Sequence, residues 1–278
     1  MHHRDAATLA KLRRALAPRI VVAALLVATI VFLVGCASLG GDQNTFAPEG
    51  DVAQKQRDLF LIVLWPAIAI LIAVTAVLVY TLVRYRRRRE DEALPKQIHG
   101  NNRLEVAWTI APLLLLAGIA VPTIMGIVDL GRGAKEDALH VRVVAFQWDW
   151  RFEYIDPEFA DAEGEPLTAD ELYVPVDREV GVELASLDVI HSFWVPKLAG
   201  KLDVVPGRTN KMWFNATTPG TFSGQCAEFC GIGHAIMRFN VIALEEEQFA
   251  ACMRELQDGE SEPVACELEQ TAATASEG

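Results

Sequence analysis

Two long uncharged apolar runs constrain the fold more than any other feature of this 278-residue chain. One run extends from Leu59 to Val83 and the other from Val106 to Val128. A helix needs about 20 apolar residues to cross the hydrocarbon core of a bilayer, so each run is long enough to span a membrane. Three prolines interrupt the runs, which membrane helices tolerate: Pro66, Pro112 and Pro122. The sequence therefore predicts a transmembrane helical hairpin over residues 59–128.

The connection between the two runs is strongly basic. Short loops rich in lysine and arginine stay on the cytoplasmic side of a membrane. Both outer ends of the hairpin, and everything after about residue 129, are therefore expected on the outer face. The basic residues are Arg84, Arg86, Arg87, Arg88, Arg89, Lys96 and Arg103.

A third apolar run, from Ile20 to Gly35, follows a basic N-terminal stretch. This is the layout of a secretory signal. The run closes on Leu33-Val34-Gly35-Cys36, which resembles the bacterial lipobox, in which the cysteine is lipidated and becomes the mature N-terminus. We predict a signal peptide over 1–35, lipidation of Cys36 and an outer N-terminal segment over 36–58. A plain signal anchor with an incidental Cys36 is the alternative.

The charge of the chain is unevenly distributed. Residues 129–278 carry 28 acidic and 11 basic side chains, whereas residues 1–128 carry 9 and 14. An acidic outer domain does not suit nucleic acid, whose phosphates attract lysine and arginine, so no nucleic-acid partner is expected. The surplus acid can steer a basic protein partner, or it can simply keep the domain soluble. Charge alone leaves both interpretations open.

The outer region has the pattern of β-structure. The stretch FQWDWRFEY at 146–154 places an aromatic side chain at every second position, which predicts one strand with an aromatic face. Pro-Gly pairs separate further candidate strands, and many short strands favour an antiparallel sandwich over 129–257. An acidic loop over 156–170 and an acidic disordered tail over 258–278 are also expected. The other predicted strands are 172–174, 180–186, 189–195, 211–216 and 237–244.

Two cysteines, a histidine and a methionine lie within twelve residues in CAEFCGIGHAIM, at Cys226, Cys230, His234 and Met237. A second histidine, His191, lies upstream in DVIHSFWVP. Zinc prefers four firm ligands, often in Cys-x2-Cys pairs, and methionine is a poor zinc ligand. Soft sulfur donors together with imidazole favour copper. A structural disulfide between the two cysteines is the alternative in an oxidising compartment.

The number of cysteines bears on how many copper ions the motif can hold. A mononuclear blue-copper centre uses one cysteine, two histidines and a weak axial methionine, so this set has one cysteine too many. Two cysteines can instead bridge two copper ions, each completed by one histidine. The axial positions then fall to Met237 and to an oxygen donor from the loop, for which the carbonyl of Glu228 is the candidate.

Four motifs after a two-span hairpin carry a resemblance to a known family: CAEFCGIGHAIM, DVIHSFWVP, KLDVVPGR and QWDW, with LEVAWTIAP at the head of the second span. Over roughly residues 55–250 the chain resembles subunit II of cytochrome c oxidase. The resemblance implies a two-helix transmembrane hairpin followed by an all-β cupredoxin-like Greek-key sandwich, in a bacterial cell membrane. It also implies electron transfer from cytochrome c through a dinuclear copper A centre to the haems of subunit I, where oxygen is reduced and protons are pumped. Subunits I and III are the implied partners.

The resemblance also implies roles for individual residues. The side chain of Glu228 would reach a magnesium ion shared with subunit I. Trp148 occupies the position where electrons enter, beside Asp149, which departs from the family's frequent tyrosine. Glu105 falls at the mouth of a proton channel, although acidic residues also favour first helix turns. Copper ligation carries over onto His191, Cys226, Glu228 (through its backbone carbonyl), Cys230, His234 and Met237.

Other functions stay open on sequence alone. A copper-delivery or thiol-redox protein of the thioredoxin type would use Cys-x3-Cys with a distant histidine, but it needs a βαβ pattern, and none is found. The copper domain of nitrous oxide reductase would need a large additional catalytic domain. A lipoprotein that only stabilises a complex is a third alternative. Quinol oxidases of the family lack the copper ligands, so their presence here favours cytochrome c as the donor.

Two further predictions concern residues outside these motifs. Cys252 and Cys266 have no copper role and lie in an oxidising compartment, so we predict a disulfide between them. Acidic residues that flank the aromatic strand are candidates for steering cytochrome c: Asp149, Glu153, Asp156 and Glu158.

Overall fold

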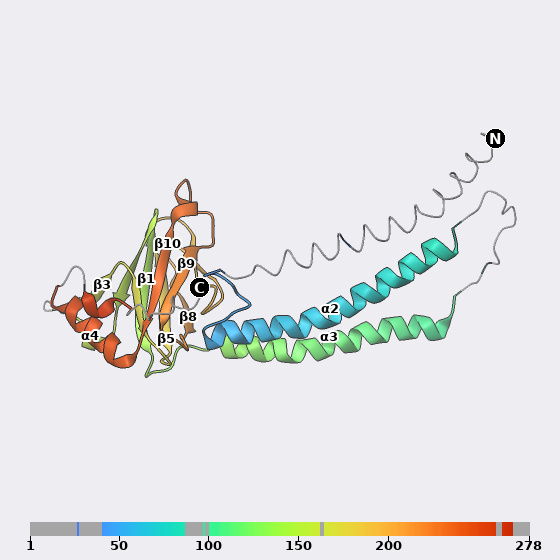
Figure 1. Ribbon diagram of the computed structural model, residues 1–278, viewed down its shortest axis with the longest axis horizontal. Helices are drawn as coiled ribbons and strands as arrows, with labels where there is room; N and C mark the ends of the chain where they lie inside the picture. Colours follow the sequence, from blue (N-terminus) through green and yellow to red (C-terminus); the bar gives the residue numbers. More distant parts are fainter. Residues whose placement is uncertain are drawn as a thin grey trace, which may run out of the picture. The chain divides into compact units, whose positions relative to one another are not determined.

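The computed structural model describes residues 27, 41–86, 97, 100–161, 164–259 and 263–268. The chain divides into two compact units, residues 1–44 and residues 45–278. The second unit contains two long helices and a β-domain (Figure 1). The predicted signal peptide, its lipidation site Cys36 and most of the basic loop lie outside the described residues.

Two apolar helices form the predicted hairpin. Helix α2 (Asp51–Arg84) and helix α3 (Asn102–Leu130) lie side by side (Figure 1) and contain Pro66, Pro112 and Pro122 without a break. In both helices the most apolar stretch has no buried residue. A helix that is apolar on every face needs an apolar solvent around it, which agrees with two membrane spans. α3 is capped by Asn101, whose side chain accepts from the backbone N–H groups of Arg103 and Leu104.

The β-domain is a sandwich of two five-stranded sheets, in the orders β3-β2-β1-β5-β8 and β4-β10-β9-β6-β7. Most pairs are antiparallel, as predicted, but β1–β5 and β4–β10 are parallel. Parallel neighbours cannot be joined by a tight hairpin, so the chain crosses between the sheets at these points. The strands are β1 (Leu139–Phe146), β2 (Asp149–Tyr154), β3 (Leu167–Ala169), β4 (Leu172–Pro175), β5 (Val180–Ser186), β6 (His191–Trp194), β7 (Leu202–Val204), β8 (Asn210–Phe214), β9 (Gly220–Cys226) and β10 (Arg238–Leu244).

The prediction of one strand over 146–154 is wrong. β1 ends at Phe146, Gln147 and Trp148 form a two-residue turn, and β2 begins at Asp149, which pairs with Phe146. Neither Gln147 nor Trp148 is a typical turn residue, so the alternating aromatics concealed the turn. The consequence is functional, because the turn removes Trp148 from the row of core aromatics and leaves it 40% exposed.

Several short elements were not predicted from the sequence. They include β1, β3, β7 and β9, and helix α4 (Glu246–Gln257), whose buried face covers the sandwich with Phe249, Cys252 and Met253. Residues 263–268, expected to be disordered, form the short 3-10 helix η3 (Val264–Cys266). A disulfide joins Cys266 in η3 to Cys252 in α4, which confirms the predicted pair.

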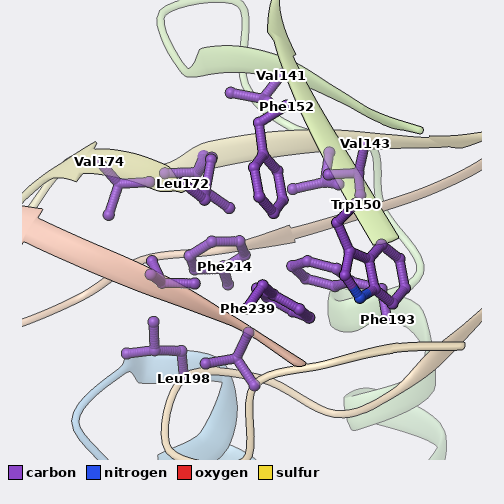
Figure 2. Close-up of a cluster of buried hydrophobic side chains, with 14 of the residues drawn as sticks. Val141, Val143, Trp150, Phe152, Leu172, Val174, Phe193, Leu198, Phe214 and Phe239 are labelled. Carbon is purple, nitrogen blue, oxygen red and sulfur yellow. The ribbon is translucent and has the colours of Figure 1, made fainter. Parts of the chain in front are cut away.

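The core between the sheets is aromatic and branched-aliphatic (Figure 2). Trp150 and Phe152 from β2 meet Phe193 from β6 and Phe239 from β10, whose rings stack with centroids 4.8 Å apart. These side chains are at most 5% exposed. Burying an aromatic or branched side chain stabilises by about 1.5–3 kcal/mol, so this cluster anchors β6 and β10 beside the ligand motif.

Candidate metal centre

Two neighbouring strands and the loop between β9 and β10 bring the predicted ligands together. His191 is the first residue of β6 and Cys226 the last of β9, and these strands pair with Phe193 opposite Cys226. Cys230 and His234 lie in the following loop, and Met237 directly precedes β10. The antiparallel register therefore unites a histidine and a cysteine that lie 35 positions apart in the sequence.

The two cysteine sulfurs lie 3.8 Å apart and are not bonded to each other. Each has a histidine of its own. Cys226 Sγ lies 3.9 Å from Nδ1 of His191, and Cys230 Sγ lies 3.7 Å from Nδ1 of His234. The alternative of a structural disulfide between these cysteines does not agree with this arrangement.

The two remaining donors each lie near a different cysteine. Met237 Sδ lies 3.7 Å from Cys230 Sγ, and the carbonyl oxygen of Glu228 lies 3.2 Å from Cys226 Sγ. Each thiol therefore has one imidazole and one weak donor near it. Thiol, imidazole and thioether groups gathered in this way suit a soft metal ion.

Four of the six donor residues are buried, whereas His234 is half-buried and Glu228 is exposed. His191, Cys226, Cys230 and Met237 are at most 5% exposed. Burial, together with the neighbouring Cys226 thiol, raises the pKa of the Cys230 thiol to about 11. A thiolate is the form that binds metal, so a bound cation has to replace the proton in this pocket. Within the part of the chain that the structure describes, His191, Cys226 and Cys230 form a group of close metal-binding side chains.

Asp188 supports the centre from outside and was missed by the sequence analysis. Its carboxylate accepts from Nε2 of His191 at 2.9 Å and from the backbone N–H of Gln147 at 2.7 Å. Burial alone would raise the pKa of Asp188, but these hydrogen bonds and one from the N–H of Val189 hold it below its usual value. A carboxylate on the far nitrogen of a ligating histidine fixes the ring and its tautomer. The only sequence signal was the acidic residue three positions before His191.

The ligand loop is also held by the turn that contains Trp148. The carbonyl oxygen of Cys230 accepts from Nε1 of Trp148 at 3.1 Å and from Nε2 of Gln147 at 2.8 Å. The indole lies against Gly233, where an added Cβ would come within 2.5 Å of the ring. Gly231 has a φ of +119°, which favours glycine. Small residues in the loop thus allow the indole to lie directly over it.

The donor set fits copper better than zinc. Two cysteines, two histidines and a methionine converge in one cluster, in which all but His234 are buried, and thioether with thiolate donors prefer copper. The surrounding fold is a β-sandwich, not the βαβ arrangement that a thioredoxin-type copper-delivery protein would need. The cluster is therefore a candidate copper site.

The other predicted site residues lie apart from this cluster. Glu105 is exposed in the first turn of α3. Among the steering candidates, Asp149 and Glu158 are exposed. Glu153 instead lies within ion-pair distance of Arg151 and Arg142, and Asp156 contacts His140.

The fold and site define a class: a membrane-anchored β-sandwich domain with a buried cysteine, histidine and methionine cluster. Comparison with known proteins narrows this class. A family described as "Cytochrome C oxidase subunit II, periplasmic domain" matches residues 139–244, and its transmembrane counterpart matches residues 47–125. The chain belongs to the cytochrome c oxidase subunit II family, with two transmembrane helices and an outer copper-binding cupredoxin domain.

Individual relatives agree with the family. Cytochrome c oxidase subunit 2 of Alkalihalophilus pseudofirmus is 39% identical over 84% of this chain and 67% of its own length. Quinol oxidase subunit 2 of Bacillus spizizenii is 32% identical, over 88% of this chain and 74% of its own. The periplasmic domain of subunit II from Bradyrhizobium japonicum is a solved structure with 29% identity and a TM-score of 0.39, covering 45% of this chain and 97% of that one. The alignments span 64–67% of the first three cytochrome c oxidase relatives.

Proposed function

We propose that the protein accepts electrons from cytochrome c at a dinuclear copper A centre and passes them to the haems of oxidase subunit I, for oxygen reduction coupled to proton pumping. One observation carries the proposal: two unbridged cysteine sulfurs lie 3.8 Å apart, each beside its own histidine. One tetrahedral ion could take two cysteines and two histidines, but Met237 and the Glu228 carbonyl add a fifth and a sixth donor, which suits two copper ions better than one. The proposed partners are subunits I and III of the oxidase.

The candidate ligands would have different roles in binding the metal. Cys226 and Cys230 would bridge both ions, and His191 and His234 would each complete one. Met237 and the Glu228 carbonyl would act as the weak donors that tune the centre. Bound copper would supply a site that gains and loses one electron with little rearrangement. Burial keeps water away from His191, both cysteines and Met237, and Asp188 keeps the ring of His191 in place.

Trp148 is the proposed point where electrons enter. Its indole is 40% exposed, and its N–H donates to the carbonyl of Cys230 at 3.1 Å. An electron arriving at the ring therefore has a path of one hydrogen bond and a few covalent bonds to a ligand. Phe229 and Ile232, in the loop that carries Cys230, are exposed apolar residues and offer a surface for a docked partner. The acidic outer domain would steer a basic cytochrome c toward it.

The choice of donor rests on the ligands rather than on the family. A quinol oxidase subunit is also a relative of this chain, at 32% identity. Family membership alone therefore leaves the donor open. The complete set of cysteine, histidine and methionine donors supports cytochrome c.

Four finer assignments belong to the same proposal. The Glu228 side chain would contact a magnesium ion shared with subunit I, and Glu105 would lie at the mouth of a proton channel. Cys36 would be lipidated after removal of residues 1–35, giving a bacterial lipoprotein anchored on the outer face. The proposed domains are 36–58, 59–128 and 129–257. Mass spectrometry of the mature chain tests the lipoprotein form, because an unmodified Met1 would contradict it.

Copper content and spectrum test the main proposal. The full-length chain, purified in detergent and loaded with copper, should bind two ions and show one unpaired electron shared over both. A fragment from residue 129 is unsuitable, because Val52 belongs to the core of the outer domain. One copper per chain, or a preference for zinc, would contradict the proposal.

A further inference from the structure

The first turn of membrane helix α2 is capped by the outer domain instead of by its own sequence. The first N–H groups of any helix lack partners within the helix, and the N-cap residue Gly50 has no side chain to supply one. Asn215, just after β8, accepts from the N–H of Asp51 through Oδ1 at 3.0 Å. The carbonyl of Leu198 accepts from the N–H of Ala53 at 3.2 Å.

The contact is reciprocal and partly buried, because Asn215 is buried whereas Asp51 is exposed. Nδ2 of Asn215 donates to the Asp51 carboxylate at 3.0 Å, so the side chain of Asn215 binds both the backbone N–H and the side chain of Asp51. Asn215 is 8% exposed, and Val52 and Ala53 are each 4% exposed. Val52 belongs to the same hydrophobic cluster as the sandwich core. The beginning of α2 is therefore built into the outer domain.

The segment before the helix fits the same surface closely. The Glu49 N–H donates to the Lys197 carbonyl at 2.8 Å, and the Glu49 carbonyl accepts from the N–H of Thr217 at 2.8 Å. A Cβ on Gly50 would lie 2.3 Å from the backbone oxygen of Asn215. Backbone cannot yield as a flexible side chain can, so only glycine permits this approach.

A second set of contacts joins the other helix to the same region. Lys55 of α2 pairs with Asp129 of α3 at 2.6 Å. Directly after α3, Arg132 binds the Glu179 carboxylate with two nitrogens, at 2.7 and 2.9 Å, and lies 3.9 Å from the ring of Trp213. Paired hydrogen bonds of this kind are among the strongest that side chains form.

The cap is connected to the copper ligands through one short stretch of chain. Leu198 lies seven positions after His191, and β6 runs directly into the loop that binds α2. Leu198 is fully buried, and its N–H donates to the carbonyl of Val195. The first turn of α2 is therefore fixed to the outer domain close to the segment that carries a copper ligand, and a shift of this turn would displace the hairpin relative to that domain as a whole.

We propose that the cap formed by Gly50, Asp51, Leu198 and Asn215 positions the copper centre relative to the membrane hairpin. This rests on the proposed function, because the hairpin is the part of the chain expected to pack in the membrane beside the haem-bearing subunit. Tunnelling rates fall exponentially with distance. The cap thus sets the rate of the second electron-transfer step, from copper to haem, and leaves the first step, from cytochrome c to copper, unaffected.

The test compares Gly50→Ala with Gly118→Ala in the assembled oxidase. Gly118 is the matched control, because a Cβ there meets no other atom of this chain within 4 Å. Laser-triggered injection of electrons from cytochrome c resolves both steps. Gly50→Ala should slow haem reduction about tenfold, since misplacement by about 1 Å can cost up to a hundredfold where geometry is critical. Copper reduction and the copper spectrum should match those of the control.

A double variant that exchanges the side chains of Asp51 and Asn215 distinguishes loss of the cap from general damage to the fold. Asn215→Asp places two carboxylates together and should slow haem reduction, whereas Asn215→Asp combined with Asp51→Asn restores a donor opposite an acceptor and should recover the rate. Unchanged haem reduction in Gly50→Ala and Asn215→Asp, no recovery in the double variant, or equal slowing of both steps would overturn the proposal.

Hydrogen exchange at residues 51–54 gives a readout that needs neither copper nor electron transfer. Gly50→Ala should exchange faster there than Gly118→Ala. Equal protection in the two variants would overturn the cap itself. Should the wild-type centre not accept electrons from cytochrome c, the proposed function fails, while the exchange measurement still decides whether the cap exists.

Discussion

The outer domain contains two cysteine pairs with opposite fates. Cys226 and Cys230 are four positions apart and remain free thiols at 3.8 Å, whereas Cys252 and Cys266 are fourteen positions apart and form a disulfide. All four cysteines are at most 5% exposed, so burial does not separate the pairs. The two pairs differ in the side chains that surround them. Histidine and methionine donors surround the first pair, while the second lies between α4 and η3, beside apolar Met253.

The side chains around a cysteine pair therefore decide whether it binds metal or forms a disulfide. A disulfide is complete in itself and stabilises by restricting the unfolded chain. A pair of thiols surrounded by imidazole and thioether groups is complete only with a metal. The first pair should therefore matter for copper and electron transfer, and the second for stability.

The largest effect should follow a change in the copper pair. Cys226→Ser should abolish the shared-electron spectrum, because one bridging thiolate is expected to hold both ions. Met237→Leu should keep both ions and shift the reduction potential, since a weak axial donor mainly tunes the centre. Copper analysis and paramagnetic resonance of the full-length chain make the comparison. Equal loss of copper in the two variants would show that Met237 is a principal ligand.

A large loss of rate should follow removal of the indole beside the copper pair. Trp148→Gln should reduce electron transfer within the docked cytochrome c complex by roughly a hundredfold, the scale expected when a critical geometry is lost. Copper content should be unchanged. Leu187→Gln is the control, because Leu187 is also an exposed apolar residue, 66% accessible.

Stopped-flow reduction, the copper spectrum and a thermal melt should be recorded on the same samples of Trp148→Gln. A normal transfer rate would exclude Trp148 as the point where electrons enter. A lost rate accompanied by a damaged spectrum would instead assign Trp148 a structural role.

Breaking the disulfide should cost stability and nothing else. Replacing both Cys252 and Cys266 with alanine should lower the free energy of unfolding by roughly 3 kcal/mol, the value for closing a loop of about 15 residues. Copper content and the rate of reduction by cytochrome c should stay at wild-type values. Loss of copper in this variant would contradict the claim that the Cys252–Cys266 disulfide serves stability alone.

The smallest effect should appear at a structural ion pair remote from both cysteine pairs. The hydrogen bonds from Arg132, with a further one from the Lys135 N–H, lower the pKa of Glu179 from 4.5 to about 2. A carboxyl group whose pKa is lower in the folded state stabilises above its unfolded pKa and loses this contribution as the pH falls through the folded value. The stability gap between wild type and Glu179→Gln should therefore shrink between pH 5 and pH 2.

Denaturant unfolding at several pH values measures this gap. Glu136→Gln, at an exposed position nearby, serves as the control. A gap that stays constant down to pH 2 would mean that the Glu179 carboxylate does not depend on Arg132. Copper reduction at neutral pH should be the same in both variants.

The sequence predicted what local spacing and composition determine. The apolar runs located both membrane helices, and the spacing within residues 226–237 located four donors that the fold does bring together. His191 was predicted because its motif was specific. The disulfide was predicted by elimination, since no copper role remained for Cys252 and Cys266.

Contacts between distant segments could not be predicted in this way. The turn at Trp148 was hidden by regular aromatic alternation, and Asp188 shows its role only once β1, β6 and the loop after β5 are in place. The parallel pairs β1–β5 and β4–β10 depend on crossovers that leave no local signal. The cap on α2 joins Asp51 to Asn215 across 164 positions. In each case the side chain is ordinary and its partner is remote.

The most direct test of the account is the copper stoichiometry and paramagnetic spectrum of the full-length chain, measured beside Cys226→Ser and the double alanine variant of Cys252 and Cys266. Two copper ions sharing one unpaired electron in the wild type, retained without the disulfide and lost without Cys226, is the predicted result. A single copper ion per wild-type chain, or a shared-electron spectrum that survives Cys226→Ser, would contradict the assignment of this cysteine pair to a dinuclear centre.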